Sequence, residues 1–163
     1  MKNTSCCSCL SPKAPLACGL CEESVCKSCA QFLDESSFAF IKKKPDVISH
    51  TTYCPNCFDN NVAAELQKYN EDIEKARNIA VFDKAQAKET RNFKRFNETY
   101  SVRECPDREE TLLRLAFQAV RSGFNAIIEV EISSKKVRES SRQRTIYSGL
   151  AQAAMLNEGK RFK

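Results

Sequence analysis

The stretch 18-CGLCEESVCKSC-29 places four cysteines within twelve residues, as two C-x-x-C pairs that four residues separate. A further pair, Cys6 and Cys9, precedes this stretch, and another, Cys54 and Cys57, follows it. The two sulfurs of one pair can both lie about 2.3 Å from one Zn²⁺, while the turn between them leaves backbone N–H groups free to bond the thiolates. Eight such cysteines predict two closed Cys₄ sites that hold two Zn²⁺.

The short linker between Cys21 and Cys26 indicates how the four pairs are shared. Its four residues span at most about 17 Å when fully extended, which is enough to leave one site and enter another. Spacing alone does not prove the pairing, but it favours an interleaved one. The predicted ligands are Cys6, Cys9, Cys26 and Cys29 for zinc 1, and Cys18, Cys21, Cys54 and Cys57 for zinc 2. Metal binding, worth about 10–16 kcal/mol per site, would let this segment with few apolar residues fold.

Two further residues compete for these places. Cys6 fits the C-x-x-C repeat better than Cys7, so Cys6 is the predicted ligand, although spacing leaves Cys7 open. His50 is the single histidine of the chain and precedes Cys54 by four residues. All eight places already have a cysteine, so His50 is not expected to bind metal.

Disulfides, an iron–sulfur cluster and a redox pair fit the cysteine pattern less well than zinc does. A disulfide framework needs an oxidising compartment, yet the N-terminal sequence lacks the apolar run of a signal peptide and no run of about 18 apolar residues occurs. An iron–sulfur cluster would favour closer C-x2-C-x2-C runs, and a redox C-x-x-C pair normally stands alone beside a βαβ pattern. We therefore expect a cytoplasmic protein with reduced, metal-binding thiols.

Charge divides unevenly along the chain. Residues 1–60 hold six Lys/Arg and six Asp/Glu, whereas residues 61–163 hold twenty and fifteen, so the net charge of +5 comes from the second part. With eight thiolates and two Zn²⁺ the first part becomes about −4. Nucleic acid is therefore not expected as a partner.

The middle spacing C-x2-C-x4-C-x2-C resembles the FYVE-type and related cross-brace zinc fingers. The gap of four also resembles the plant-homeodomain (PHD) finger, with Cys26 where that family usually has histidine. RING fingers generally have two or three residues at that gap and a histidine before it, although 53-YCPNC-57 is similar to the C-P-x-C pair that ends many of them. The resemblance implies a rigid two-zinc module over about 55 residues and does not identify a partner.

Lipid binding is weakly indicated. FYVE fingers carry a basic R-[RK]-H-H-C-R patch that binds a phosphoinositide headgroup, whereas this chain has 13-KAPLACGL-20 there, with Lys13 alone. The segment 36-SSFAFIKKKP-45 joins aromatic residues to three lysines and could make weak contact with an anionic membrane. The favoured alternative is a strand that packs Phe38 and Phe40 on one face of a core.

A long helix is predicted after the cysteine-rich region. No Gly or Pro occurs from Asn61 to about Thr90, and apolar residues recur at steps of three and four from Val62 to Ala80. A helix or short coiled coil that binds a partner would have this pattern. A connecting helix that rests on the protein's own domains is favoured over it.

The remaining chain predicts the order β-α-β-β. Strands are expected at 98–105, 126–133 and 144–155, where apolar and polar residues alternate or small apolar residues gather, and a polar, basic loop is expected at 133–144. A helix over 106–125 would begin with Asp107 as N-cap and Glu110 three residues later, and would end at Gly123. Its predicted inner face comprises Leu112, Leu115, Ala116, Ala119 and Val120.

This second part resembles the YbjQ-like domains. The resemblance lies in 116-AFQAVRSGFNAIIEVEI-132, with a helix that ends in a small-residue turn before a strand, and in the later small-residue patch 147-YSGLA-151. Phe124 replaces the family's usual alanine. The resemblance covers roughly 65 residues and implies no agreed chemistry.

No catalytic constellation is recognisable after residue 60. Cys105, Asp107 and the glutamates form no obvious pair of nucleophile and base, and Cys105 beside Pro106 is expected to pack as a small apolar residue. The basic loop and the tail 159-GKRFK-163 are expected to be solvated, with an acidic partner as the alternative.

The sequence therefore predicts an α+β chain in three parts: a two-zinc FYVE-like finger (1–60), a helical connector (61–92) and a YbjQ-like β-α-β-β domain (93–159). We expect a non-enzymatic adaptor whose finger is a platform for a protein partner and whose C-terminal domain binds or forms a homo-oligomer. A membrane-targeting finger that binds anionic lipid and a RING-like ubiquitin-ligase module are the alternatives.

Overall fold

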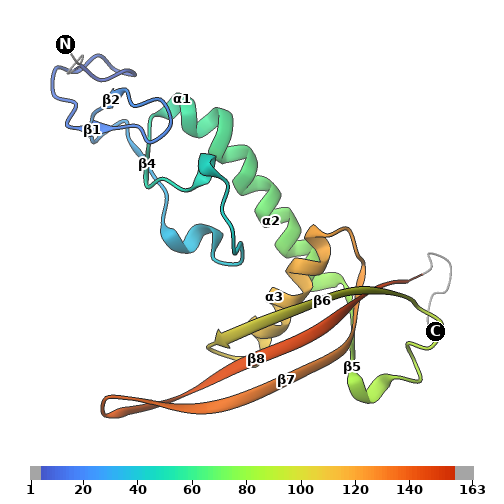
Figure 1. Ribbon diagram of the computed structural model, residues 1–163. Coiled ribbons are helices and arrows are strands. Elements are labelled where there is room, and N and C mark those ends of the chain that lie inside the picture. The colour runs from blue at the N-terminus through green and yellow to red at the C-terminus, as the bar shows by residue number, and fades with distance from the viewer. Residues whose placement is uncertain (1–4, 157–163) are drawn as a thin grey trace. The chain divides into compact units, whose positions relative to one another are not determined.

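The computed structural model describes residues 5–156 (Figure 1). Contacts between Cα atoms divide the chain into two compact units, Met1–Asn70 and Glu71–Lys163. The boundary falls within helix α2, which spans Ala63–Asn78. The described residues contain both helix and strand, as an α+β chain does.

The first unit consists of short elements around the cysteines. Two small antiparallel sheets pair β1 (Leu16–Ala17) with β2 (Ser24–Val25) and β3 (Gln31–Phe32) with β4 (Thr52–Tyr53). Two 3₁₀ turns, η1 (Glu35–Phe38) and η2 (Asp46–Ile48), lie between β3 and β4. Helix α1 (Pro55–Cys57), a π-helical turn η3 (Phe58–Val62) and α2 follow β4 without interruption.

The core of this unit is small. Its fully buried large side chains are Phe38, Ile48, Tyr53, Val62 and Val25. The ring of Phe38 meets Tyr69 of α2 edge-on, with 5.1 Å between centroids. The Tyr53 hydroxyl accepts a hydrogen bond from the His50 amide and donates one to the Val47 carbonyl, which ties the long loop before β4 to the core.

The predicted strand through Phe38 and Phe40 was wrong. Asp34 has extended backbone, and turn bonds from Ser37 N–H to the Asp34 carbonyl and from Ala39 N–H to the Ser36 carbonyl wind the next residues into 3₁₀ turns. This winding removes the alternation of a strand. Phe38 therefore enters the core, while Phe40 stays half-buried beside Tyr69.

The helix predicted from Asn61 to about Thr90 is also corrected. Helix α2 ends at Asn78, and Ala80–Asp83 form strand β5, followed by the 3₁₀ turn η4 (Lys84–Gln86). The absence of Gly and Pro permits a helix but does not require one, because tertiary packing overrides weak propensity. Here β5 forms a ladder with another strand, and Phe82 packs against a cluster of Ala126, Ile128 and Ala154.

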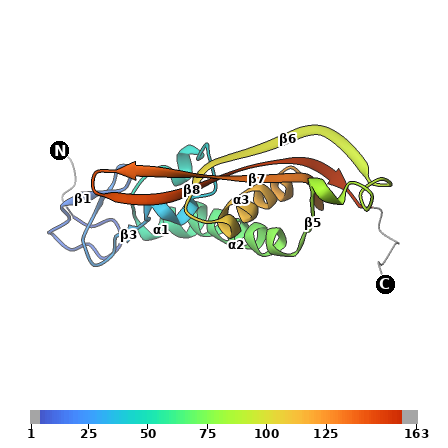
Figure 2. The same ribbon diagram turned by 90° about the horizontal axis from the view of Figure 1, so that it is seen from below.

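The second unit contains a four-stranded sheet in the order β5-β7-β8-β6. Strands β6 (Lys94–Cys105), β7 (Ala126–Glu139) and β8 (Arg142–Met155) are long, and only the β5–β7 pair is parallel. Helix α3 (Arg108–Arg121) connects β6 to β7 and lies on one face of the sheet (Figure 2). The predicted strand, helix, strand and strand thus occur in that order, and β5 adds a fourth strand.

The ends of α3 follow the capping signals in the sequence. Asp107 Oδ1 accepts a hydrogen bond from the Glu110 amide at 2.7 Å, as an N-cap does. At the other end Gly123 has φ +87°, its amide bonds the Val120 carbonyl, and the Phe124 amide bonds the Ala119 carbonyl. These two bonds form a Schellman motif, in which a left-handed residue ends the helix.

The polar, basic loop predicted at 133–144 was wrong. These residues belong to β7 and β8, which pair in register out to Glu139 and Arg142 and turn through Ser140 and Ser141. Ser140 has φ 55°, in the left-handed region that two-residue hairpin turns use. Val137 is the one apolar residue within 133–144, so this segment lacks the apolar alternation that usually marks a strand. A two-stranded ribbon that meets solvent on both faces does not need that alternation.

The small-residue patch 147-YSGLA-151 has a packing reason. A Cβ atom on Gly149 would lie 2.8 Å from Thr111 Cγ2 and 2.9 Å from Leu115 Cδ1. Both side chains come from α3 and are fully buried. Helix α3 therefore approaches β8 so closely at this position that only glycine fits without displacement.

Candidate metal centre

The structure gathers eight cysteines into two clusters of four. One cluster is Cys6, Cys9, Cys26 and Cys29, and the other is Cys18, Cys21, Cys54 and Cys57; within each, the sulfur atoms lie within 4.8 Å of one another. The chain visits the clusters alternately, so the first and third pairs meet, as do the second and fourth. Two Cys₄ clusters in this order are consistent with a cross-brace zinc-binding region.

Sulfur separations test whether the clusters suit a tetrahedral ion. Cys9 and Cys26 have sulfurs 3.6 Å apart, and those of Cys21 and Cys54 are 3.8 Å apart. A tetrahedron with metal–sulfur bonds of about 2.3 Å has edges of about 3.8 Å. All eight cysteines are free thiols, so neither cluster contains a disulfide. The donor set and its spacing therefore fit Zn²⁺.

The first pair of each cluster lies in a backbone turn of the same form. The amide of the residue after the second cysteine bonds the carbonyl of the first: Leu10 bonds Cys6, and Glu22 bonds Cys18. Leu10 and Glu22 both have φ 60°, which is uncommon for residues other than glycine. Because the strained turn recurs at both clusters, it is a shared feature of the two C-x-x-C loops.

The second pair of each cluster lies at the start of a helical turn. The Ala30 amide bonds the Cys26 carbonyl, and the Phe58 amide bonds the Cys54 carbonyl. Cys54 is also the N-cap of α1, and its sulfur accepts a hydrogen bond from the Cys57 amide at 3.4 Å. Helix starts suit thiolates because free backbone N–H groups point toward them.

The two halves of each cluster are joined by another repeated bond. The residue after the first cysteine donates its amide to the carbonyl two residues before the partner pair: Cys7 bonds Ser24, and Gly19 bonds Thr52. Both clusters thus have the same three parts: a backbone turn at the first pair, a hydrogen bond that joins the two pairs, and a helical turn at the second pair. The four pairs are structurally a duplicated unit in which the two copies interleave.

Backbone donors and neighbouring sulfurs set the acidity of the thiols. Backbone N–H groups of Cys9 and Cys26 lower the pKa of Cys6 to about 6. Burial raises the pKa of Cys18, but backbone N–H groups, chiefly that of Cys21, outweigh it and bring the pKa to about 6. Each cluster thus contains one thiol that ionises readily.

The last cysteine of each cluster behaves in the opposite way. Hydrogen bonds with the sulfurs of Cys26 and Cys9 raise the pKa of Cys29 to about 12. Burial, followed by the sulfur of Cys54, raises the pKa of Cys57. Four thiolates so close together repel one another without a cation, so a bound divalent ion would displace the remaining protons.

His50 lies outside both clusters and has a packing role. A Cβ atom on Gly19 would lie 2.4 Å from His50 Cβ, so the His50 side chain packs directly against the turn that contains Cys18 and Cys21. Its ring also meets Tyr53 edge-on, with 6.1 Å between centroids. The close approach of His50 explains why glycine follows Cys18.

A hollow of about 430 Å³ lies beside the first cluster. It is lined by Ser5, Cys6, Cys7, Leu10, Glu22, Glu23 and Ser24. Leu10 has 76% of its surface exposed, and Cys7 is exposed as well. The sequence pattern did not single out Glu22 and Glu23. Their place directly after the second C-x-x-C pair was a signal for them, because the turn there brings them next to the first pair.

The second unit contains no cysteine cluster within residues 71–156. Cys105 has 1% of its surface exposed, as expected of a small core residue. The predicted tail 159-GKRFK-163 lies outside the described residues. On the sheet, Leu150 is 56% exposed and lines two shallow hollows of about 280 and 300 Å³, with Glu131 common to both.

Closed Cys₄ sites favour a structural role for the metal, because catalytic zinc keeps one position open for water or substrate.

No helix within residues 5–156 is both long and apolar enough to cross a membrane. The chain matches no protein-family model, no curated protein and no solved structure.

Proposed function

We propose that the chain is a zinc-binding adaptor in which the cysteine-rich region is a rigid platform for a protein partner and the second unit binds or oligomerises. The observation that carries the proposal is the pair of Cys₄ clusters at tetrahedral spacing. Such sites fix loops that have few apolar contacts of their own. We assign the ions as Zn²⁺, the ligands as the two predicted sets, and the location as the cytoplasm, where thiols stay reduced.

The hollow beside Leu10 is the best-supported contact surface of the platform. An exposed leucine gives apolar area, and Glu22 and Glu23 add negative charge at its edge. The cluster thiolates add further negative charge, since four thiolates exceed the charge of one Zn²⁺. A partner segment with an apolar residue flanked by basic ones would complement this surface.

Leu150 supports the proposed role of the second unit. It lies on the sheet face away from Gly149, whose side is covered by α3, since neighbouring strand residues point to opposite faces. An exposed leucine between two hollows gives a homo-oligomer or a partner an apolar contact. We also propose that the first part is a FYVE- or PHD-like finger and that the second part is a YbjQ-like domain.

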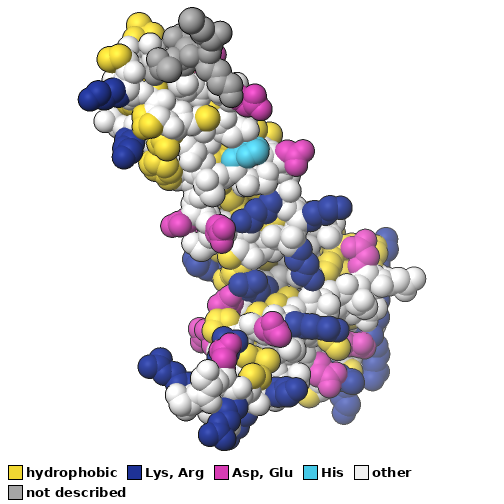
Figure 3. All heavy atoms as spheres, turned by 60° about the vertical axis from the view of Figure 1, so that its left-hand side comes forward, with side chains coloured by type: hydrophobic (Ala, Val, Ile, Leu, Met, Phe, Trp, Pro, Cys, Tyr) yellow, Lys and Arg dark blue, Asp and Glu magenta, His cyan; other side chains and the backbone are white. Residues whose placement is uncertain are grey.

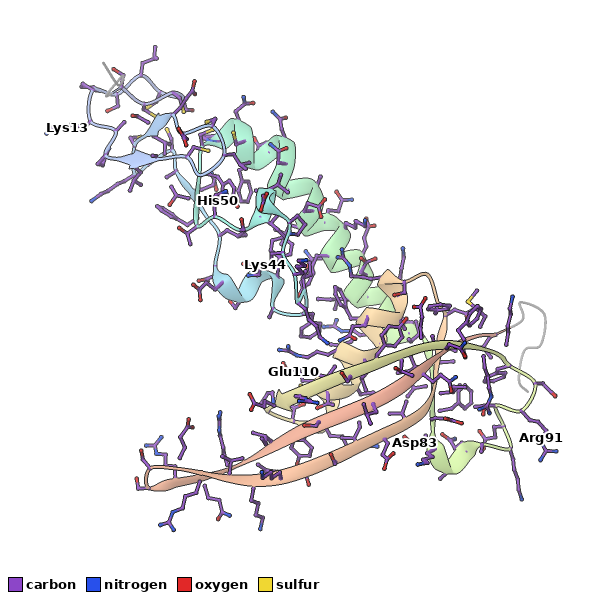
Figure 4. The ribbon with its side chains drawn as sticks, in the orientation of Figure 1. Lys13, Lys44, His50, Asp83, Arg91 and Glu110 are labelled. Atoms are coloured by element: carbon purple, nitrogen blue, oxygen red, sulfur yellow. The ribbon has the colours of Figure 1, made fainter. Side chains whose placement is uncertain are left out.

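The lipid alternative has little structural support. It requires protruding aromatic residues beside the lysines, but Phe38 is fully buried. Lys44 donates to the Glu35 carbonyl at 3.0 Å, and Lys13 and Lys44 lie at different ends of the first unit (Figure 4). The RING-like alternative needs a groove that joins Leu10 to Pro55, and Pro55 does not line the hollow.

The test is selection of peptides against the zinc-loaded chain. We expect enrichment of peptides in which an apolar residue lies between basic ones. Leu10→Ser should weaken the selected peptides at least tenfold with zinc content unchanged, and Phe32→Ser, which removes another exposed side chain of this unit, should not. Selected peptides that bind the wild type and Leu10→Ser equally would contradict the assignment of this surface.

A further inference from the structure

The distal part of the β7–β8 hairpin is a ribbon without neighbouring strands. The last pair between β6 and β8 is Cys105 with Tyr147, and the last between β5 and β7 is Asp83 with Val130. Beyond them, residues 135–146 pair only with each other, from Lys135 opposite Ile146 to Glu139 opposite Arg142. At about 3.3 Å per residue this ribbon extends roughly 17 Å past the sheet. Figure 1 shows it beyond the end of β6.

Positive charge is concentrated in this ribbon. Residues 135–146 contain five basic side chains, Lys135, Lys136, Arg138, Arg142 and Arg144, and one acidic side chain, Glu139. The net charge of these twelve residues is therefore +4, in a chain whose total is +5. Lys and Arg side chains are prominent at the lower end of the second unit in Figure 3. Such a density points to a ligand with closely spaced negative charges.

The two faces of the ribbon differ. Residues directly opposite each other share a face, so Lys136 with Thr145 and Arg138 with Gln143 form one face, which we call the basic face. The other face carries Lys135, Val137, Glu139, Arg142, Arg144 and Ile146. There Arg144 pairs with Glu139 at 3.4 Å. The basic face has no acidic side chain, and within residues 5–156 no ion pair involves Lys136 or Arg138.

We propose that the ribbon is a binding arm for duplex nucleic acid, and that its basic face contacts the phosphate backbone. A two-stranded ribbon is one of the protein elements that fit the major groove of B-DNA, which is about 12 Å wide. Lysine, arginine, glutamine and threonine side chains are typical phosphate contacts. These are the four residue types on the basic face.

Membranes and acidic proteins suit the ribbon less well as partners. Its tip, from Glu139 to Arg142, has no apolar side chain that could enter a membrane. Protein interfaces rely on buried aromatic or large apolar anchors, and the ribbon carries only the half-buried Val137 and Ile146 on its opposite face. The expectation that nucleic acid is no partner rests on the charge of the cysteine-rich region in the first unit, whereas the ribbon belongs to the second unit.

The experiment uses the full chain loaded with zinc and a fluorescein-labelled 20-base-pair DNA duplex of mixed sequence. Anisotropy titrations between 50 and 200 mM salt give affinity and its salt dependence. Lys136→Gln/Arg138→Gln should weaken binding at least tenfold at 50 mM salt, and should reduce the slope of log affinity against log salt by about 2, or about 0.9 for each phosphate that is no longer neutralised. Lys135→Gln/Arg142→Gln removes the same charge from the other face and should cost less than threefold.

Four further results would count against the proposal. An RNA duplex of the same length should bind more weakly, because its major groove is too narrow for the ribbon; equal binding would overturn the groove assignment. Equal losses for the two double variants would overturn the role of the basic face. Tighter binding to vesicles that contain phosphatidylserine than to DNA, or no DNA binding at 50 mM salt, would overturn the proposal as a whole. Amide spectra of both variants should match the wild type.

Discussion

The two units of this chain acquire their order from different sources. In the first, eight cysteines gather around a core with few large side chains, of which Phe38, Tyr53 and Ile48 are the largest that are fully buried. In the second, a helix and a four-stranded sheet bury Phe117, Leu115, Ile127 and Ile128 without any cluster of ligands in its described part. On the proposed two-zinc assignment, the comparison teaches that metal binding would replace apolar packing where the chain has little of it.

Loss of one zinc ligand should have the largest effect on structure, and it tests the difference between the two units most directly. Cys18→Ser removes a buried thiol whose site is worth about 10–16 kcal/mol of binding free energy. We expect zinc content to fall by about half or more, with collapsed amide signals in the first unit and unchanged signals in the second. Cys7→Ser is the matched control and should keep two zinc ions, because its sulfur lies outside both clusters.

Fragments test whether the second unit folds independently of the first. The fragment 71–163 should fold without zinc, because it contains the whole β5-β7-β8-β6 sheet. A fragment 92–163 lacks β5, and with it Phe82, which packs against the cluster that contains Ile128. If this fragment folds, its free energy of unfolding should be about 2–5 kcal/mol lower than that of fragment 71–163, as is usual when large core side chains are lost. Urea unfolding followed by circular dichroism measures both. A zinc requirement for fragment 71–163 would contradict the independence of the second unit.

A smaller effect is expected where α3 packs against β8. Gly149→Ala places a methyl group against Thr111 and Leu115 and should cost about 1–3 kcal/mol of unfolding free energy. The destabilisation should appear in the second unit alone, with zinc content unchanged. Ser148→Ala at the neighbouring position serves as control. If Gly149→Ala is neutral, the close approach of α3 is not a constraint on this sheet.

The smallest predicted effect concerns the start of α3. Asp107→Ala removes the bond from the Glu110 amide and should destabilise the second unit by about 1 kcal/mol, whereas Asp107→Ser keeps a capping oxygen and should cost less. Thermal melts of the fragment 71–163 would measure both differences. Equal stability of the two variants would mean that the cap contributes nothing.

What the sequence could predict depended on how local the determining interactions are. The C-x-x-C pairs predicted which cysteines gather because ligand geometry depends on a few adjacent residues and one short linker. Asp107 and Gly123 marked the ends of α3 for the same reason. Strand β5 was missed because its ladder partner is distant in sequence, with Ala80 opposite Ala126, and nothing within 80-AVFD-83 excludes a helix.

The ribbon at residues 133–144 and the segment with Phe38 and Phe40 were predicted wrongly for different reasons. Residues 133–144 lack apolar alternation because both ribbon faces meet solvent, so the usual strand signal is absent. Phe38 and Phe40 have the spacing of a strand, but turn bonds from Ser37 and Ala39 wind that segment and bury Phe38 alone. The hollow beside Leu10 depends on contact between two turns that are separate in sequence.

The most direct test of the central claim is the zinc content of the purified full chain. Native mass spectrometry together with elemental analysis should find two Zn²⁺ per chain. Titration with a strong chelator should remove both and collapse the amide signals of the first unit, while those of the second unit persist. A chain that is folded in both units with no zinc, or with a single zinc at full occupancy, would contradict the account.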